Sequence, residues 1–266
     1  MLAKIRATFV RDARLAFSYR LWFVTQILTV AASVTSLWFV SHIVPPSSSF
    51  GFHGEPTSYF NFAVINVAFL AFQATALSSF ERSIRDSQVF GTLEATFATP
   101  TSVGLVVLGS AAWTFALTLV TSIAYLLFGM LFGMRLDHLN VLTCLVFLVL
   151  TITATAPLGI MSAAAVMALK QGAPVQFLLN TATSILAGVL FPISVLPVWL
   201  QYCSWLLPIT HALNGIRAGV AGALPGDVAP DLWWLFLASL MLLPLSLWVF
   251  GGAVNRAKFD GTLAQY

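Results

Sequence analysis

The sequence predicts an all-α polytopic membrane protein, because of its composition and the length of its apolar runs. Of the 266 residues, 59% are hydrophobic and only 8% are charged, whereas a soluble domain carries about 25% charged residues. The mean hydropathy is +0.93. The apolar runs are continuous over about twenty residues, the length that an α-helix needs to cross a bilayer. Strands of a membrane barrel instead alternate apolar and polar residues over about ten positions.

Six apolar runs predict six transmembrane helices in a single domain, 1–266. The expected spans are about 21–43, 58–80, 103–133, 139–169, 174–192 and 231–251. Pro157 is expected to break the fourth span, because a proline removes a helix hydrogen bond. Residues 2–20 precede the first span, with apolar residues at three- and four-residue steps and basic residues on the opposite face. They predict an interfacial amphipathic helix, and the alternative is a simple basic lead that sets topology.

The basic residues are distributed very unevenly between the two sides of the predicted bundle. With six spans both termini share one side, and that side holds ten of the twelve basic residues: Lys4, Arg6, Arg11, Arg14, Arg20, Arg82, Arg85, Lys170, Arg256 and Lys258. Only Arg135 and Arg217 fall on the other side. Because cytoplasmic loops carry an excess of Lys and Arg, we expect both termini in the cytoplasm of a cell-membrane protein.

The stretch 84–102, IRDSQVFGTLEATFATPTS, is a polar interruption between two apolar runs on the expected cytoplasmic side. Val89, Leu93 and Phe97 recur every four residues, so they share one face of a helix. Thr99-Pro100 is expected to end that helix, because the residue before a proline avoids the helical region. We expect a short amphipathic helix at about 84–99. It is either a loop helix that faces solvent and membrane, or a docking element for the groove of a partner.

The segment at about 193–225 is apolar but divided by prolines. Pro192, Pro197 and Pro208 separate stretches that are too short to cross a bilayer. Short apolar helices at membrane depth are typical of re-entrant or interfacial segments. We therefore expect extracellular re-entrant helices between spans five and six, at the external mouth of a pathway.

Three predicted spans carry uncharged polar residues at helical spacing: Gln26, Thr29, Ser33 and Ser36; Asn66 and Gln73; and Gln176, Asn180 and Ser184. Amide side chains cost free energy in lipid unless they face protein or water. These residues therefore either bond helices together or line a hydrated pathway or a seam between subunits. An uncharged polar lining among aromatic residues favours an amphipathic or sugar-bearing cargo over a bare ion.

Catalytic and metal-binding patterns are missing from the sequence. It has no HExxH, no GxSxG and no GxxxxGK[ST], so the chain is not expected to be an enzyme or to hydrolyse ATP itself. The histidines are scattered, and the two cysteines lack metal spacing; they are His42, His53, His138, His211, Cys144 and Cys203. No metal or bound cofactor is expected, and no basic patch suits nucleic acid. No acidic residue falls mid-span, where ion-coupled carriers usually place one.

Two separate motifs resemble the type-2 ABC exporter permeases. Residues 81–102, ERSIRDSQVFGTLEATFATPTS, resemble the coupling-helix segment of that family. Residues 191–217, FPISVLPVWLQYCSWLLPITHALNGIR, resemble its signature before the last span, with Phe-Pro, Leu-Pro, Pro-x-Thr-His and a closing Arg. The six-span layout and the N-terminal helix also fit, so the resemblance covers nearly the whole chain. The family includes exporters of polysaccharides, lipo-oligosaccharides, lipids and drugs.

The resemblance implies a mechanism and a set of partners. Two permease subunits, identical or related, would pair in the bilayer with two P-loop ATPase subunits that bind ATP and Mg. The helix at 84–99 would sit in the ATPase through Arg85, Asp86, Gln88, Val89, Gly91, Leu93, Glu94, Phe97 and Pro100. Spans one, two and five would line the substrate pathway. The external gate would include Pro192, Pro197, Trp199, Pro208 and His211.

The cargo and some rival functions remain open at this point. The sequence lacks large external domains, which leaves amphipathic drug-like or lipid-like cargo, ranked first, and polysaccharide or lipo-oligosaccharide cargo. A stand-alone channel or a membrane-embedded enzyme would work without any ATPase. An assembly or immunity scaffold would form complexes without moving cargo.

Overall fold

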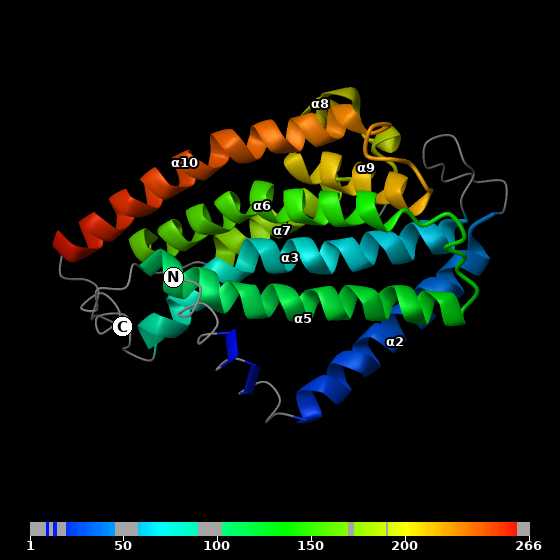
Figure 1. The fold of residues 1–266 in the computed structure, drawn as a ribbon, viewed down its shortest axis with the longest axis horizontal. Coiled ribbons are helices and arrows are strands. Elements are labelled where there is room, and N and C mark those ends of the chain that lie inside the picture. Colours follow the sequence, from blue (N-terminus) through cyan, green and yellow to red (C-terminus); the bar gives the residue numbers. More distant parts are fainter. Residues whose placement is uncertain are drawn as a thin grey trace.

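The computed structural model describes residues 9–10, 13–14, 20–45, 58–89, 103–169, 173–189 and 191–259. Long helices run lengthwise through the molecule (Figure 1): α2 (Arg20–Ile43), α3 (Tyr59–Val89), α5 (Val103–Leu131), α6 (Val141–Leu169) and α10 (Ala229–Phe259). Shorter elements follow α6: α7 (Ala173–Leu186), η1 (Ile193–Val195), α8 (Val198–Leu206) and α9 (Pro208–Val220). Every one of these elements is helical, so the described residues confirm an all-helical protein.

Five of the described helices are long and apolar enough to cross a membrane. They are α2, α3, α5, α6 and α10, and they coincide with the expected spans one to four and six. The fifth expected span, 174–192, is shorter than predicted. Its helix α7 has 14 residues, and at 1.5 Å per residue it covers about 21 Å of the roughly 30 Å hydrocarbon layer. Five of the described helices are thus long enough to span a bilayer, and α7 with the turn after it lies along the return path between the end of α6 and the start of α10.

Local chemistry explains where some of these helices begin. The Oγ of Ser58 accepts a hydrogen bond from the backbone N–H of Asn61 at 3.3 Å, at the start of α3. The Oδ1 of Asn140 accepts one from the N–H of Thr143 at 3.2 Å, at the start of α6. Ser and Asn are favoured at such positions because the first N–H groups of a helix have no partner within it.

Helix α6 corrects the prediction that Pro157 breaks the fourth span. The helix is continuous from Val141 to Leu169 with Pro157 inside it, and the proline is buried. A membrane helix tolerates proline where neighbouring helices pack against it and local adjustment satisfies the freed carbonyl. Here α6 packs against both α3 and α10.

Helix α3 also differs from the expected boundaries. The sequence placed the end of span two at about residue 80 and the start of a separate amphipathic helix at about 84. Helix α3 instead runs without interruption from Tyr59 to Val89, so residues 84–89 extend the span beyond its apolar part. The rest of the expected helix, 90–99, lies outside the described residues, as does most of the expected interfacial helix at 2–20.

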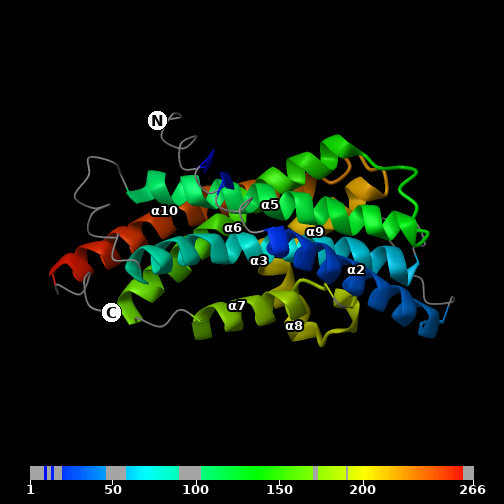
Figure 2. The same cartoon turned by 90° about the horizontal axis from the view of Figure 1, so that it is seen from below.

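Different secondary-structure elements lie at the two ends of the bundle. At one end, on the left of Figure 1, helices α3, α6 and α10 finish and α5 begins. At the other end lie α8 and α9, the turn between α5 and α6, and the start of α10. Figure 2 shows α7 and α8 on the opposite side of α3 from α5. The segment 193–220, here called the α8–α9 segment, thus caps one end of the bundle.

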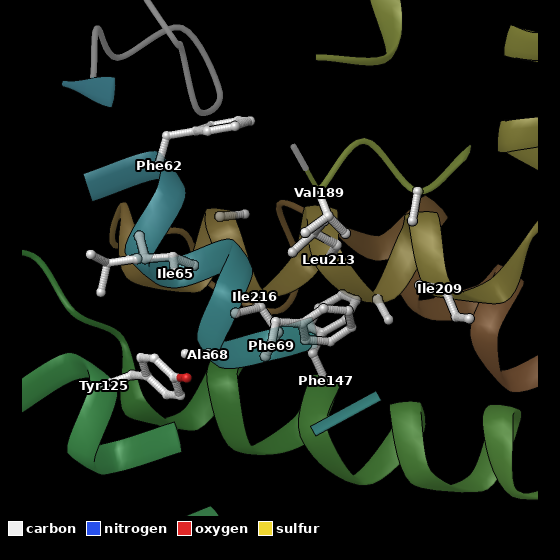
Figure 3. Close-up of a cluster of buried hydrophobic side chains, with 14 of the residues drawn as sticks. Phe62, Ile65, Ala68, Phe69, Tyr125, Phe147, Val189, Ile209, Leu213 and Ile216 are labelled. Carbon is white, nitrogen blue, oxygen red and sulfur yellow. The ribbon is translucent and has the colours of Figure 1, made fainter. Parts of the chain in front are cut away.

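Helix α3 is the central helix of the bundle. Its apolar residues Phe62, Ile65 and Phe69 are at most 3% exposed, and they meet residues from α5, α6 and α9 in one cluster (Figure 3). The outer faces of α2, α5 and α10, by contrast, leave large apolar side chains exposed. This arrangement suits a lipid environment, in which apolar outer faces carry no cost.

Candidate transport site

A buried arginine joins three elements near the α8–α9 end of the bundle. Arg217 of α9 is 8% exposed. Its Nε donates to Oδ1 of Asn66 on α3 at 3.0 Å, and its Nη2 donates to the carbonyl oxygen of Gly188 at 2.6 Å. The guanidinium also lies 4.7 Å from the ring centroid of Phe62, within the range of a cation–π interaction. We call these residues and Val189 the Arg217 cluster.

The same cluster determines how α7 ends. Asn66 completes it, because its Nδ2 donates to the carbonyl oxygen of Val189 at 2.8 Å. Gly188 has a φ of +69°, and a Cβ there would lie 2.7 Å from the Ile193 side chain. Only glycine adopts this left-handed conformation readily. The turn that stops α7 short of a full span therefore also presents two carbonyl oxygens to Arg217 and Asn66.

Helix α9 packs very closely on α6 through two glycines. A Cβ on Gly215 would lie 2.0 Å from Cε1 of Phe147, a side chain with no exposure. A Cβ on Gly219 would lie 2.8 Å from Sγ of Cys144. The carbonyl oxygen of Gly219 accepts a hydrogen bond from the N–H of Asn140 at 2.8 Å. Small residues four apart allow such backbone approach between membrane helices.

The predicted gate residues fall at the end of the bundle that the α8–α9 segment caps, in different environments. Pro208 begins α9 and is buried, whereas Pro197 precedes α8 and is exposed. Pro192 is half-buried, and Trp199 is 67% exposed on α8. His211 is 13% exposed and contacts Asp231 of α10. These residues share a region of the fold but do not converge on one point.

The two amides predicted on span two lie on one face of α3, as expected, and both are completely buried within the chain. Asn66 belongs to the Arg217 cluster, and Nε2 of Gln73 donates to Oγ1 of Thr183 on α7 at 2.7 Å. Oε1 of Gln73 is buried without a hydrogen-bond partner. The geometry favours a role in holding α3 to α7 and its following turn, and both side chains are sealed from the surface of a single chain.

The polar residues predicted on span one lie on a more open face. Thr29 and Ser36 are exposed, and their hydroxyls donate to the carbonyl oxygens of Thr25 and Ala32 on their own helix, each at 2.8 Å. Gln26 and Ser33 are half-buried. Helix α2 therefore presents polar side chains outward, at a surface that remains available to a pathway or to a second subunit.

On α7, Asn180 and Ser184 are half-buried, and the hydroxyl of Ser184 donates to the carbonyl oxygen of Asn180 at 2.6 Å. Nothing is described of the Gln176 side chain. The predicted stripes thus separate into an inward-facing set on α3 and outward or partly open sets on α2 and α7.

The residues predicted to contact an ATPase are only partly described. Arg85, Asp86, Gln88 and Val89 lie on the last turns of α3, without described side chains. The other members of the set lie outside the described residues: Gly91, Leu93, Glu94, Phe97 and Pro100.

We expect a double variant, Gln73→Met with Thr183→Val, to fold and to keep transport activity close to that of the native chain. Removing both partners of a buried hydrogen bond is nearly neutral, whereas removing one costs about 1–3 kcal/mol. Thermal unfolding of the single and double variants checks the first part. If the double variant folds normally but changes which cargo is transported, Gln73 lines the pathway instead.

Sequence reasoning missed the structural role of Arg217 and the tight packing of Gly215. Arg217 appeared in the sequence only as one of two basic residues on the outer side and as the closing Arg of a motif. The available signal was its position in an apolar segment, since an ionisable residue at membrane depth needs a partner. Its partner Asn66 is 151 positions away, and no local pattern connects the two.

Comparison with known proteins agrees with this architecture. The family model described as ABC-2 type transporter matches residues 1–220, most of the chain. The chain belongs to the ABC-2 type transporter family. This family match covers the α8–α9 segment up to the last residue of α9, so the Arg217 cluster lies within it. The chain is also similar to Nodulation protein J of Sinorhizobium fredii, with 29% identity over 197 residues that cover 69% of this chain and 74% of that protein. It is thus a multi-pass transport protein of the ABC-2 type.

Proposed function

We propose that this chain is the permease subunit of an ATP-driven exporter, in which two permease chains pair with two P-loop ATPase subunits. The observation that carries the proposal is the ABC-2 type transporter match over residues 1–220. The described helices also include five that are long and apolar enough to span a membrane. In this account the chain forms the pathway and ATP with Mg binds to the partner. Homodimer and related heterodimer remain alternatives for the permease pair.

The distribution of charge supports one orientation in the membrane. Arg82, Arg85 and Arg256 lie toward the end of the bundle at which α3 and α10 finish, and Arg135 lies in the turn between α5 and α6 at the opposite end. By the excess of basic residues in cytoplasmic loops, the first end would face the cytoplasm and the α8–α9 segment would face outward. Both termini would then be cytoplasmic.

The polar extension of α3 and the residues that follow it would receive the input from the ATPase. The affinity of this contact must differ between the ATP-bound and the nucleotide-free states of the ATPase. A contact of equal strength in both states would couple no work to transport. The face formed by Val89, Leu93 and Phe97 would supply the apolar anchors. The exposed polar face of α2 would contribute to the pathway or to the seam with the second permease.

Leu93→Asp is expected to reduce co-purification with the ATPase and the stimulation of ATP hydrolysis by at least about tenfold, because a buried charge replaces an apolar anchor. A suitable control is Leu139→Asp, which introduces the same charge at a partly exposed leucine in the turn between α5 and α6. Affinity capture and an ATPase assay in nanodiscs measure the effect. Unchanged stimulation in Leu93→Asp would remove this helix from the coupling interface.

The cargo is proposed to be an amphipathic drug-like or lipid-like molecule, because hydroxyls and the amide of Gln26 lie among large apolar and aromatic side chains on α2. A polysaccharide or lipo-oligosaccharide is the alternative cargo. Proteoliposomes that contain the chain, its ATPase and either a fluorescent amphiphile or a labelled oligosaccharide lipid distinguish the two, since only the true class is moved in an ATP-dependent manner.

A further inference from the structure

His211 lies where three helices of the α8–α9 end meet, and both of its ring nitrogens face acceptors. Nδ1 is 2.5 Å from Oδ1 of Asp231 on α10, and Nε2 is 2.8 Å from the carbonyl oxygen of Trp205 on α8. His211 itself belongs to α9. A single ring therefore connects α8, α9 and α10.

Counting protons shows that this arrangement needs one more proton than a neutral ring and a carboxylate provide. A neutral imidazole has one N–H donor and one acceptor nitrogen. A carbonyl oxygen only accepts, and so does an ionised carboxylate. Both contacts are hydrogen bonds only if the ring carries two protons or if Asp231 carries one. In either form, the His211–Asp231 pair holds one proton.

The surroundings favour placing that proton on the ring. Asp231 lies in the first turn of α10, where the helix dipole stabilises a negative charge. The ring of His211 lies 5.8 Å from that of Trp205 and 5.4 Å from that of Trp234, measured between centroids. Both indoles therefore lie within the distance over which an aromatic ring interacts with a cation. The helix dipole that favours an ionised Asp231 is the main reason to place the proton on the ring.

Asp231 is the charged group that contacts His211 among the described residues. Other titratable or charged side chains on elements packed against α9 are exposed or contact other residues: Tyr59, Asp137, His138, Cys144, Tyr202, Cys203, Arg217 and Asp227. The nearest of these along α9, Arg217, bonds to Asn66 instead. The protonation of His211 is thus coupled most directly to that of Asp231.

We propose that the His211–Asp231 pair is a proton-binding latch that holds α8 and α10 onto α9. With the proton bound, both hydrogen bonds are made. When the proton leaves as the pH rises, one nitrogen faces an acceptor without a hydrogen between them, and one of the two connections is lost. Building on the proposed function, in which the α8–α9 segment forms the external gate, the latch makes opening of that gate easier at higher external pH.

Asp231→Asn separates the latch from a purely structural contact. An asparagine side chain both donates and accepts, so its NH₂ donates to Nδ1 of a neutral His211 while Nε2–H donates to Trp205. The variant keeps both connections without the extra proton, and its gate is expected to stay latched at every pH. Asp231→Leu removes the connection to α10 altogether and is expected to leave the gate unlatched at every pH. His138→Gln is the control, because His138 is exposed at the same end of the bundle.

The proton is observed directly in the full chain labelled with ¹⁵N-histidine in nanodiscs. The chain has four histidines, and His211→Gln identifies the signal of His211. In spectra recorded over a range of pH, we expect a form of His211 with a proton on both nitrogens that is more populated in the native chain than in Asp231→Asn at the same pH. A native ring with one proton, together with an ionised Asp231 carboxylate in infrared spectra, overturns the proposal. This measurement needs no ATPase, so it tests the proton site independently of the proposed function.

The consequence for gating is measured in proteoliposomes with the ATPase, between about pH 5 and pH 8, the range over which histidine commonly changes its charge. Native chain and His138→Gln are expected to transport faster toward high pH by about tenfold, the shift that one charge-assisted hydrogen bond produces. Asp231→Asn is expected to lose this dependence. If Asp231→Asn keeps the native pH profile, the latch is refuted. If no variant transports while the ¹⁵N result is as expected, the proton site stands and the exporter assignment is refuted.

Discussion

Replacing Arg217 by alanine is expected to lower the free energy of unfolding by about 3 kcal/mol or more, because the chain loses two hydrogen bonds to a charged group, each contributing about 1.5–3 kcal/mol. The change also leaves Oδ1 of Asn66 and the carbonyl oxygen of Gly188 buried without their donor. Because these acceptors lie on α3 and after α7, the three elements are expected to separate together.

Thermal or denaturant unfolding of the purified chain in detergent measures this effect. Arg217→Lys is expected to be intermediate, because a lysine keeps the charge but lacks the planar fork that reaches two acceptors. Arg135→Ala is the matched control, since Arg135 is exposed in the turn between α5 and α6. If Arg217→Ala unfolds at the same temperature as Arg135→Ala, the Arg217 cluster contributes little to stability and the account of it is wrong.

Gly215→Ala is expected to destabilise the chain by about 1–3 kcal/mol, the usual cost of overpacking. The added Cβ would lie 2.0–2.4 Å from three carbon atoms of the Phe147 ring, whereas carbon atoms pack at about 3.5–4.0 Å. Phe147 has no exposure, so its ring has no free space to enter. Helix α9 must therefore move away from α6, and the α8–α9 segment with it.

The matched control is Gly251→Ala on α10, where an added Cβ meets nothing within 4 Å. There we expect stabilisation of up to about 1 kcal/mol, the difference in helix propensity between glycine and alanine. Phe147→Leu combined with Gly215→Ala is expected to cost less than the sum of the two single changes, because the residues are in contact. Equal unfolding temperatures for Gly215→Ala and Gly251→Ala would contradict the close packing of α9 on α6.

The spans could be predicted from sequence wherever one physical property decides the structure. Continuous apolar runs are sufficient to locate α2, α3, α5, α6 and α10, because the bilayer requires about twenty apolar residues in a helix. The end of α7 was not predictable in this way. The apolar run continues past it, and the helix stops because Gly188 adopts a left-handed conformation. Pro157 was misjudged because tertiary packing overrides the local effect of proline.

The candidate site was predicted less completely, because it depends on contacts between distant residues. Helical spacing placed Asn66 and Gln73 on one face of α3, and both do bond toward α7 and the turn that follows it. The spacing carried no information on what faces them. The bonds from Arg217 to Asn66 and between His211 and Asp231 join different helices, and only the folded structure brings them together. The helix and the docking role of Leu93 and Phe97 remain predictions from the sequence, because residues 90–102 lie outside the described part of the chain.

The central claim, that this ABC-2 family member moves cargo with energy from a separate ATPase, is tested most directly by reconstitution. The purified chain is placed in proteoliposomes with and without a candidate partner P-loop ATPase, and movement of a fluorescent amphiphile or a labelled oligosaccharide lipid is followed on adding ATP and Mg. We predict transport of one of these cargoes only when ATPase and ATP are both present. Flux through the chain alone, with or without ATP, would contradict the account and indicate a channel.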